Sequence, residues 1–159
     1  MSQHQINNIE GQAYDFNRVQ SLKLNNFRSY DSLDCTFQGC SVVLLGPNGS
    51  GKTNILESLS LLSPGRGLRR APFEQFRNFK GPAEWGINAK VLSNNSSYKI
   101  STGIPAGRIR GREVRINDKK VFASKSLPEI ISVSWLTPAM DQIFVDSPSS
   151  RRKFLDTMC

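Results

Sequence analysis

One eight-residue stretch limits what this chain can fold into more than any other feature. It fits the pattern G-x-x-x-x-G-K-[ST] and consists of Gly46, Pro47, Asn48, Gly49, Ser50, Gly51, Lys52 and Thr53. A continuous apolar run, Val42 to Leu45, leads into it, and residues with helical spacing follow, namely Ile55, Leu56, Leu59 and Leu62. This order predicts an α/β P-loop core, with the loop between a strand buried on both faces and an amphipathic helix.

Each fixed position of this loop has a chemical reason. Successive backbone N–H groups can cradle phosphates if the chain curls tightly, and Gly46, Gly49 and Gly51 permit that curl. The following helix directs its positive end at the β-phosphate. Lys52 is expected to reach the β- and γ-phosphates, and the Thr53 hydroxyl to bind the Mg²⁺ that bridges them. We therefore expect a nucleoside triphosphate with Mg²⁺.

Phosphate binding does not by itself predict hydrolysis. Hydrolysis needs a second acidic residue that holds Mg²⁺ at the end of an apolar strand. The sequence has no run of four apolar residues followed by Asp or Glu, because Val42–Leu45 leads into the loop and Ile130–Trp135 leads into Leu136 and Thr137. The Leu-Ser-Gly-Gly signature of ABC ATPases is also absent from the sequence. Catalytic residues therefore stay unassigned.

The remaining pattern is mostly that of strands. Alternating apolar residues predict two half-buried strands before the loop and an antiparallel β-meander after it, with apolar positions at Leu22, Leu24, Leu33, Cys35, Phe37, Trp85, Ile87, Ala89, Val91, Tyr98, Ile100, Val114 and Ile116. Asn94–Ser96 and Asn117–Lys119 are expected turns. Ile130–Trp135 is another expected strand, and helices are expected after Thr137 and after Ser147. Residues 1–18 are interpreted as a flexible N-terminal segment.

The positive charge is concentrated in two segments. The chain has 21 Lys and Arg against 13 Asp and Glu, a net charge of +8, which favours an anionic partner. Residues 66–80 and 108–120 hold nearly all of the excess. Arg108, Arg110 and Arg112 would share one face of an extended chain and suit a phosphate backbone, although an ion-paired hairpin edge explains them equally well.

Three phenylalanines in the first basic segment have helical spacing. Phe73, Phe76 and Phe79 could stack on bases, but this spacing favours a place in the core.

Several classes of protein are disfavoured by what the sequence lacks. No apolar run reaches the ~18 residues of a membrane helix, and the first residues lack the pattern of a secretory signal. Cys35, Cys40 and Cys159 form no CxxC pair and His4 is the only histidine, so a structural metal site is not expected. The odd number of thiols favours a reducing, cytoplasmic environment.

The motifs together resemble one family. Residues 22–30 (LKLNNFRSY), the loop, residues 63–70 (SPGRGLRR), Thr137-Pro138 and residues 151–156 (RRKFLD) occur in this order. The sequence resembles the N-terminal part of the RecF family, which are bacterial recombination mediator ATPases related to ABC ATPases and to the heads of SMC chromosome-maintenance proteins. The resemblance covers Val19 to the last residue. It implies that residues 19–159 form the N-terminal, incomplete part of an ATPase head.

The resemblance also implies a function. RecF-type proteins bind ATP with Mg²⁺, bind single-stranded or gapped DNA, act in SOS-linked recombinational repair and replication, and work with other mediators. They dimerise with ATP sandwiched between two heads. By resemblance, Arg28 either approaches the nucleotide phosphates or supports the loop through hydrogen bonds. The family often has an acid directly after Thr-Pro, where this chain has Ala139 and then Asp141.

Family members are longer than this chain, and their signature and second acidic motif lie in the later half. This polypeptide alone is therefore expected to hydrolyse ATP negligibly and to dimerise poorly. Two alternatives stay open at this point. One is a small-molecule P-loop kinase with residues 66–70 as a phosphate lid, and the other is a non-hydrolysing, nucleotide-dependent DNA-binding fragment.

Overall fold

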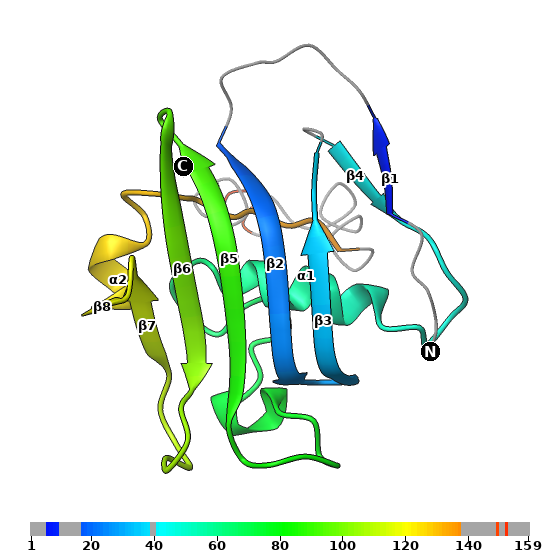
Figure 1. Ribbon diagram of the computed structural model, residues 1–159, viewed down its shortest axis with the longest axis vertical. Helices are drawn as coiled ribbons and strands as arrows, with labels where there is room; N and C mark the ends of the chain where they lie inside the picture. Colours follow the sequence, from blue (N-terminus) through cyan, green and yellow to red (C-terminus); the bar gives the residue numbers. More distant parts are fainter. Residues whose placement is uncertain (1–5, 10–16, 39–40, 138–148, 150–151, 153–159) are drawn as a thin grey trace.

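The computed structural model describes residues 6–9, 17–38, 41–137, Ser149 and Arg152. Its main body is a six-stranded antiparallel sheet with the strand order β3-β2-β5-β6-β7-β8, and a second sheet pairs β1 with β4 (Figure 1). The elements are β1 (Ile6–Ile9), β2 (Arg18–Phe27), β3 (Tyr30–Thr36), β4 (Ser41–Leu44), α1 (Lys52–Ser60), the 3₁₀ helix η1 (Phe73–Phe76), β5 (Trp85–Ser93), β6 (Ser96–Ile104), β7 (Glu113–Ile116), β8 (Lys119–Val121) and α2 (Ala123–Ser126).

The predicted meander is confirmed, and its turn residues explain it. Ser93 pairs with Ser96 across a two-residue turn in which Asn94 and Asn95 have φ of 47° and 59°. Positive φ at both central positions is the type I′ geometry, whose twist matches that of paired strands. The β7–β8 hairpin repeats this geometry at Asn117–Asp118, with φ of 49° and 65°.

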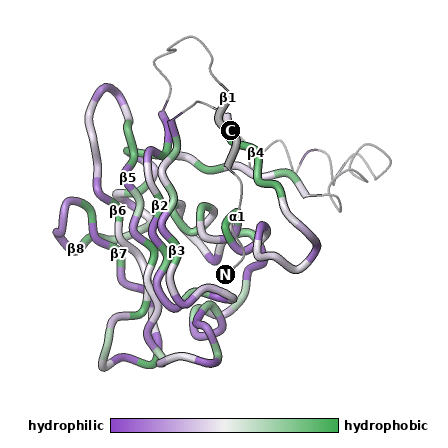
Figure 2. Tube along the Cα trace, turned by 45° about the vertical axis from the view of Figure 1, so that its right-hand side comes forward, coloured by the Kyte–Doolittle hydropathy of each residue, from purple (hydrophilic) through white to green (hydrophobic). Residues whose placement is uncertain are grey.

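The core lies between one face of the large sheet and α1 with η1, and Figure 1 shows α1 crossing behind the strands. Alternate residues of β2, β5 and β6 point into it, and the tube in Figure 2 correspondingly alternates in hydropathy along these strands. An aromatic cluster joins the helix side to the sheet, because the rings of Phe27 and Phe76 stack at 5.8 Å and Trp85 meets both edge-on. The Trp85 Nε1–H also donates to the Phe73 carbonyl at 2.8 Å.

The strand before the loop forms as expected but is not buried. In β4, Val42 is 38% and Val43 42% exposed, so the prediction of burial on both faces is wrong. The strand belongs to a two-stranded sheet, since β4 pairs with β1 and with no other strand of the described chain. Residues 6–9 of the segment interpreted as flexible form that partner strand, so the prediction of a flexible segment does not hold for these four residues.

The expected strand over Ile130–Trp135 does not form. Ile130 and Ile131 are buried and the Ser93 hydroxyl donates to the Ile130 carbonyl at 2.6 Å, but no described strand pairs with this segment. An alternating pattern needs a hydrogen-bonded neighbour before it becomes a strand. The short helix α2, just before it, was not predicted. The helices expected after Thr137 and Ser147 lie outside the described residues, apart from Ser149 and Arg152.

The three phenylalanines divide between core and surface. Phe76 is fully buried and Phe73 packs partly against the core, as expected, but Phe79 is 68% exposed. The helix ends at Phe76, and Arg77 has extended backbone, so a spacing of three no longer keeps Phe79 on the same face. Within the described part of the chain, no helix is long and apolar enough to cross a membrane.

Candidate nucleotide site

The predicted phosphate loop links β4 to α1 and has the backbone shape that its glycines allow. Gly49 and Gly51 have φ of 80° and 99°, in the region that residues with a side chain rarely adopt. Gly51 is required for a second reason, because a Cβ atom there would lie 2.5 Å from the Tyr30 hydroxyl oxygen. Tyr30 therefore packs directly against the loop, and its hydroxyl also donates to the Ser50 carbonyl at 3.4 Å.

The helix that follows presents its positive end to the loop. The amides of Asn54 and Ile55 donate to the Gly51 carbonyl at 2.8 and 3.2 Å, which begins the first turn of α1. No described side chain caps this end, and its first turn contains no acidic residue. The amides at the start of the helix and its dipole are thus available to an anion.

Lys52 and Thr53 lie at the start of α1 and line the hollow beside the loop. The Lys52 ammonium donates to the carbonyls of Gly46 and Pro47 at 2.7 and 2.8 Å, which holds it across the mouth of the loop. Thr53 is exposed. A hollow of about 340 Å³ is lined by residues 48–54 and by Arg69, so six of the eight predicted site residues line one cavity.

Arg28, in the turn between β2 and β3, bonds to α1 and does not line the hollow. Its Nε and Nη2 each donate to one carboxylate oxygen of Glu57 at 2.8 Å, and its Nη1 donates to the Gln75 carbonyl at 2.9 Å. The guanidinium also lies 4.7 Å above the Phe76 ring. Glu57 is fully buried on α1, so this pair ties the helix to the β2–β3 hairpin. The hydrogen bonds of Arg28 reach α1 and η1 rather than residues 46–53, so both roles implied for it stay predictions.

Two further residues belong to the site and were not assigned from the sequence. Arg69 enters the hollow, with its Nη1 at 3.4 Å from both Asn54 Oδ1 and Glu57 Oε2. Tyr30 packs against the loop. Burial, together with nearby Cys35, raises the pKa of its hydroxyl, which therefore stays protonated at neutral pH. In the sequence, Arg69 stood out only as one cation of a basic segment. Tyr30 stood out only as the last residue of the motif at residues 22–30.

The second basic segment is not a row of arginines on one face. Arg112 points inward and donates to the Thr102 hydroxyl at 2.7 Å, and to the carbonyls of Leu61, Ser63 and Gly65. Burial lowers its pKa to about 10, so it remains charged at neutral pH. The expectation of a shared face is wrong for Arg112, because residues 108–112 form a loop with positive φ at Gly107 and Gly111 instead of extended chain.

Most other cations of this segment are ion-paired. Glu113, whose side chain is 11% exposed, has Arg115 at 2.8 Å, Lys120 at 3.1 Å and Arg108 at 3.7 Å. Hydrogen bonds from Arg115 and then Lys120 lower the pKa of this carboxyl. This is the ion-paired hairpin edge that the sequence left open. Within the described part of the chain, five cations of the two segments are exposed without an ion pair: Arg66, Arg70, Lys80, Arg110 and Lys119.

The strand, glycine loop and helix, joined to an antiparallel sheet, define a P-loop NTPase fold of the type found in SMC heads. The chain belongs to the AAA domain family, whose model matches residues 21–136. More particularly, the chain is similar in sequence and in fold to RecF proteins. It is 41% identical over 141 residues to the DNA replication and repair protein RecF of Mesorhizobium japonicum, and 43% identical over 142 residues to that of Agrobacterium fabrum.

These matches cover 88% of this chain but only 37% and 38% of the two relatives. The chain thus spans little more than a third of their length. Solved structures agree on the fold. A structure of the recombination mediator RecF with ATP superposes with a TM-score of 0.68 at 24% identity, over 94% of this chain and 39% of that one. A structure concerning ATP-driven dimerisation and DNA-stimulated activation of SMC ATPases gives 0.69 at 18% identity, over 89% and 99%.

Proposed function

We propose that this chain binds ATP with Mg²⁺ through its phosphate loop and acts as the nucleotide-binding part of a RecF-type DNA repair and replication protein. The observation that carries this is the hollow at the start of α1. Its walls combine the loop backbone, the Lys52 ammonium, the Thr53 hydroxyl and the Arg69 guanidinium. This set of donors and cations, with no carboxylate among the described residues that line the hollow, is suited to a polyphosphate.

The residues present also fit the metal. Thr53 offers one hydroxyl ligand, and Mg²⁺ in nucleotide sites takes most of its other ligands from phosphates and water. When bound, Mg²⁺ would neutralise phosphate charge. The chain itself would orient the phosphates through its amides and Lys52.

The test is ATP binding by the purified chain and by Lys52→Ala, measured by calorimetry with Mg²⁺ present. We expect the substitution to weaken binding by about tenfold or more, since it removes a charge-assisted hydrogen bond to phosphate. Lys99→Ala is the matched control, because Lys99 is exposed, pairs with Asp118 and lies away from the loop. Equal binding by both variants would contradict an ATP site at the loop.

The finer functions follow from the likeness to RecF and from the unpaired cations. We infer binding to single-stranded or gapped DNA through residues 66–80 and 108–120, and a role in SOS-linked repair in the cytoplasm together with other mediators. ATP-dependent homodimerisation is inferred for the complete protein. In each segment, the exposed cations without an ion pair are the groups available to phosphates. The likeness to RecF favours this function over that of a small-molecule kinase.

Hydrolysis of ATP by this polypeptide alone is expected to be negligible, since its sequence contains no second acidic motif to hold Mg²⁺. Phosphate release by the purified chain, with and without DNA, tests this. Turnover that Lys52→Ala abolishes would overturn it, while ATP binding without turnover would support the nucleotide-dependent, non-hydrolysing form of the proposal.

A further inference from the structure

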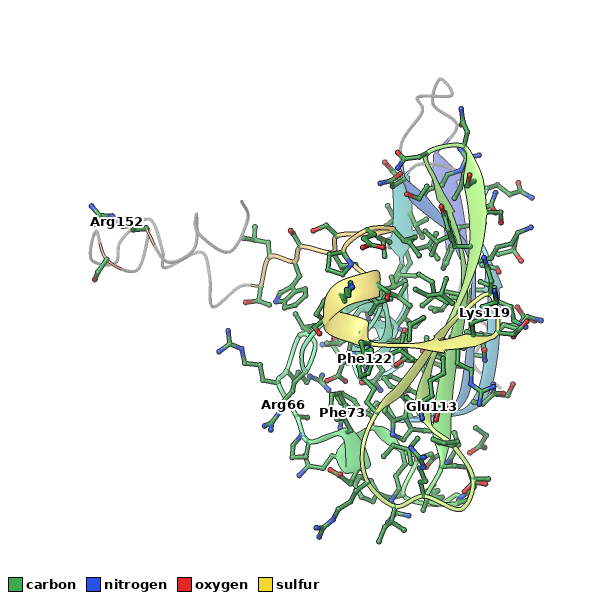
Figure 3. All side chains as sticks on the ribbon, turned by 90° about the vertical axis from the view of Figure 1, so that its left-hand side faces the viewer. Arg66, Phe73, Glu113, Lys119, Phe122 and Arg152 are labelled. Atoms are coloured by element: carbon green, nitrogen blue, oxygen red, sulfur yellow. The ribbon has the colours of Figure 1, made fainter. Side chains whose placement is uncertain are left out.

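A second hollow, of about 720 Å³, lies on the side of the molecule where β7, β8 and α2 meet the loop after α1. Figure 3 looks onto this side and labels Phe122, Phe73, Arg66, Glu113 and Lys119 around it. None of the eight loop residues of the nucleotide site lines this hollow. We call it the β8 groove and define it by its lining: Pro64, Gly65, Arg66, Phe73, Arg112, Glu113, Val114, Lys120, Val121, Phe122, Ala123 and Ser124.

The interior of the β8 groove is apolar. Phe73, Val114, Val121 and Ala123 contribute side chains that pack partly or fully against the core. Phe122 differs from these, because it lines the groove while 83% of it is exposed. Phe122 therefore extends the apolar lining of the groove to the surface, and contiguous apolar surface of this kind marks binding sites.

The polar groups inside the groove are already satisfied. Arg112 donates to one hydroxyl and three carbonyls of the protein, and Glu113 accepts from Arg115 and is ion-paired with Lys120. An occupant therefore has little to gain from hydrogen bonding at the base. It gains by burying an apolar side chain against Phe73 and Phe122.

The charges around the groove favour an occupant with acidic residues on either side of its apolar anchor. Three cations and one carboxylate line the groove, and Arg112 stays charged at neutral pH. Arg66, which lines the groove, and Lys119, which precedes the lining residue Lys120 in β8, are exposed, and no described acidic residue is ion-paired with either. Carboxylates on either side of an apolar anchor would find these cations unopposed.

We propose that the β8 groove docks a partner protein through a short acidic peptide segment carrying one aromatic or large aliphatic anchor. The anchor lies between Phe73 and Phe122, and its acidic flanks meet Arg66 and Lys119. Single-stranded nucleic acid fits less well, because the apolar lining is mostly half-buried and does not form a basic track with successive exposed rings. The β8 groove does not use the phosphate loop and extends beyond the function proposed above, although Arg66 and Lys119 are also among the cations proposed there for DNA.

The experiment measures fluorescence anisotropy of three labelled synthetic peptides with the purified chain. The first has one phenylalanine flanked by aspartate and glutamate, the second has alanine in place of the phenylalanine, and the third has lysine in place of the acids. We expect the first to bind and the second to bind about tenfold more weakly, as for an anchor residue. The third should not bind measurably, because its lysines meet like charges.

Variants locate the binding. Phe122→Ala should weaken binding of the first peptide about tenfold, because the anchor loses its contact. Arg66→Glu or Lys119→Glu should weaken binding severalfold, because the acidic flanks then meet a like charge. The matched controls are Phe79→Ala and Arg110→Glu, an exposed ring and an exposed cation outside the groove, which should leave affinity unchanged. All of the substituted side chains are exposed, and a thermal melt verifies that each variant is folded.

Other outcomes overturn the proposal. Equal affinity for the first two peptides would mean that binding depends on charge alone and that the groove holds no apolar anchor. Absence of binding by the first peptide would contradict the proposal. Competition by oligothymidine that Phe122→Ala removes would assign the groove to nucleic acid. A dimer by sedimentation that Phe122→Ala dissociates would assign it to a second copy. Lys52→Ala should bind the first peptide normally, so failure of the ATP site and failure of the β8 groove give different results.

Discussion

The two basic segments carry a similar excess of positive charge, but the structure uses them differently. In residues 66–80, Arg69 lines the hollow beside the phosphate loop, and Arg66, Arg70 and Lys80 are exposed without an ion pair in the described chain. In residues 108–120, one arginine points inward and three cations surround Glu113. The first segment is therefore the better candidate for contact with an anionic ligand, and the second mainly holds its own hairpin together.

The largest expected effect concerns the inward-pointing arginine. Arg112→Met should lower the free energy of unfolding by about 3 kcal/mol, because it leaves carbonyls inside the protein without donors. Arg110→Met, two residues away and exposed, should change it by less than about 0.5 kcal/mol. Urea denaturation followed by circular dichroism measures both. Similar decreases in the free energy of unfolding of the two variants would contradict the difference between an inward-pointing Arg112 and an exposed Arg110.

DNA binding tests the other half of the comparison. Replacing Arg66, Arg70 and Lys80 together with alanine should make the slope of log affinity against log salt shallower, by about 0.7–0.9 for each phosphate that is no longer neutralised. Replacing Arg108, Arg115 and Lys120 should change the slope less, because Glu113 already neutralises part of their charge. A titration with single-stranded and gapped DNA measures it. The reverse order of effects would assign DNA to the second segment.

A smaller effect is expected at Arg69. Arg28 already bonds both oxygens of Glu57, and Arg69 adds only a 3.4 Å ion pair from a side chain that is 46% exposed. Arg69→Ala should therefore lower the free energy of unfolding by less than about 1 kcal/mol, the range of exposed ion pairs. Arg28→Ala, as the contrasting variant, should cost about 3 kcal/mol, because it leaves Glu57 buried with a weak partner. The affinity of the chain for ATP should also fall in Arg69→Ala, because the Arg69 guanidinium lines the hollow at the phosphate loop.

The smallest effect is the pH dependence of the ion-paired edge. Arg115 and Lys120 lower the pKa of Glu113 in the folded state below the ordinary 4.5, so its pairing stabilises the fold above that value. This contribution should fade as the pH falls through the lowered pKa. Thermal melts between neutral and acid pH should show a shallower decline toward acid pH in Glu113→Gln than in the unsubstituted chain. Identical profiles would mean that Glu113 does not contribute in this way.

Local patterns predicted much of this molecule. The glycine loop, the helix after it and both two-residue turns follow from residue types whose backbone preferences act over a few positions. The alternation in β2, β3, β5 and β6 also gave the inward faces correctly, since Leu22, Leu24, Ile87 and Ile100 are all fully buried. The same reasoning failed for Ile130–Trp135, where the pattern exists but no described strand pairs with it.

The sequence by itself determined the phosphate loop, the meander and the total charge. Only the tertiary structure decided that Arg112 points inward while Arg110 is exposed, that Arg28 holds Glu57, and that Phe122 stands out of the core beside an apolar groove. The physical reason is distance along the chain. The acceptors of Arg112 include carbonyls about fifty residues earlier, and Arg28 and Glu57 are separated by almost thirty. Burial and ion pairing depend on such distant partners, and spacing between neighbouring residues does not encode them.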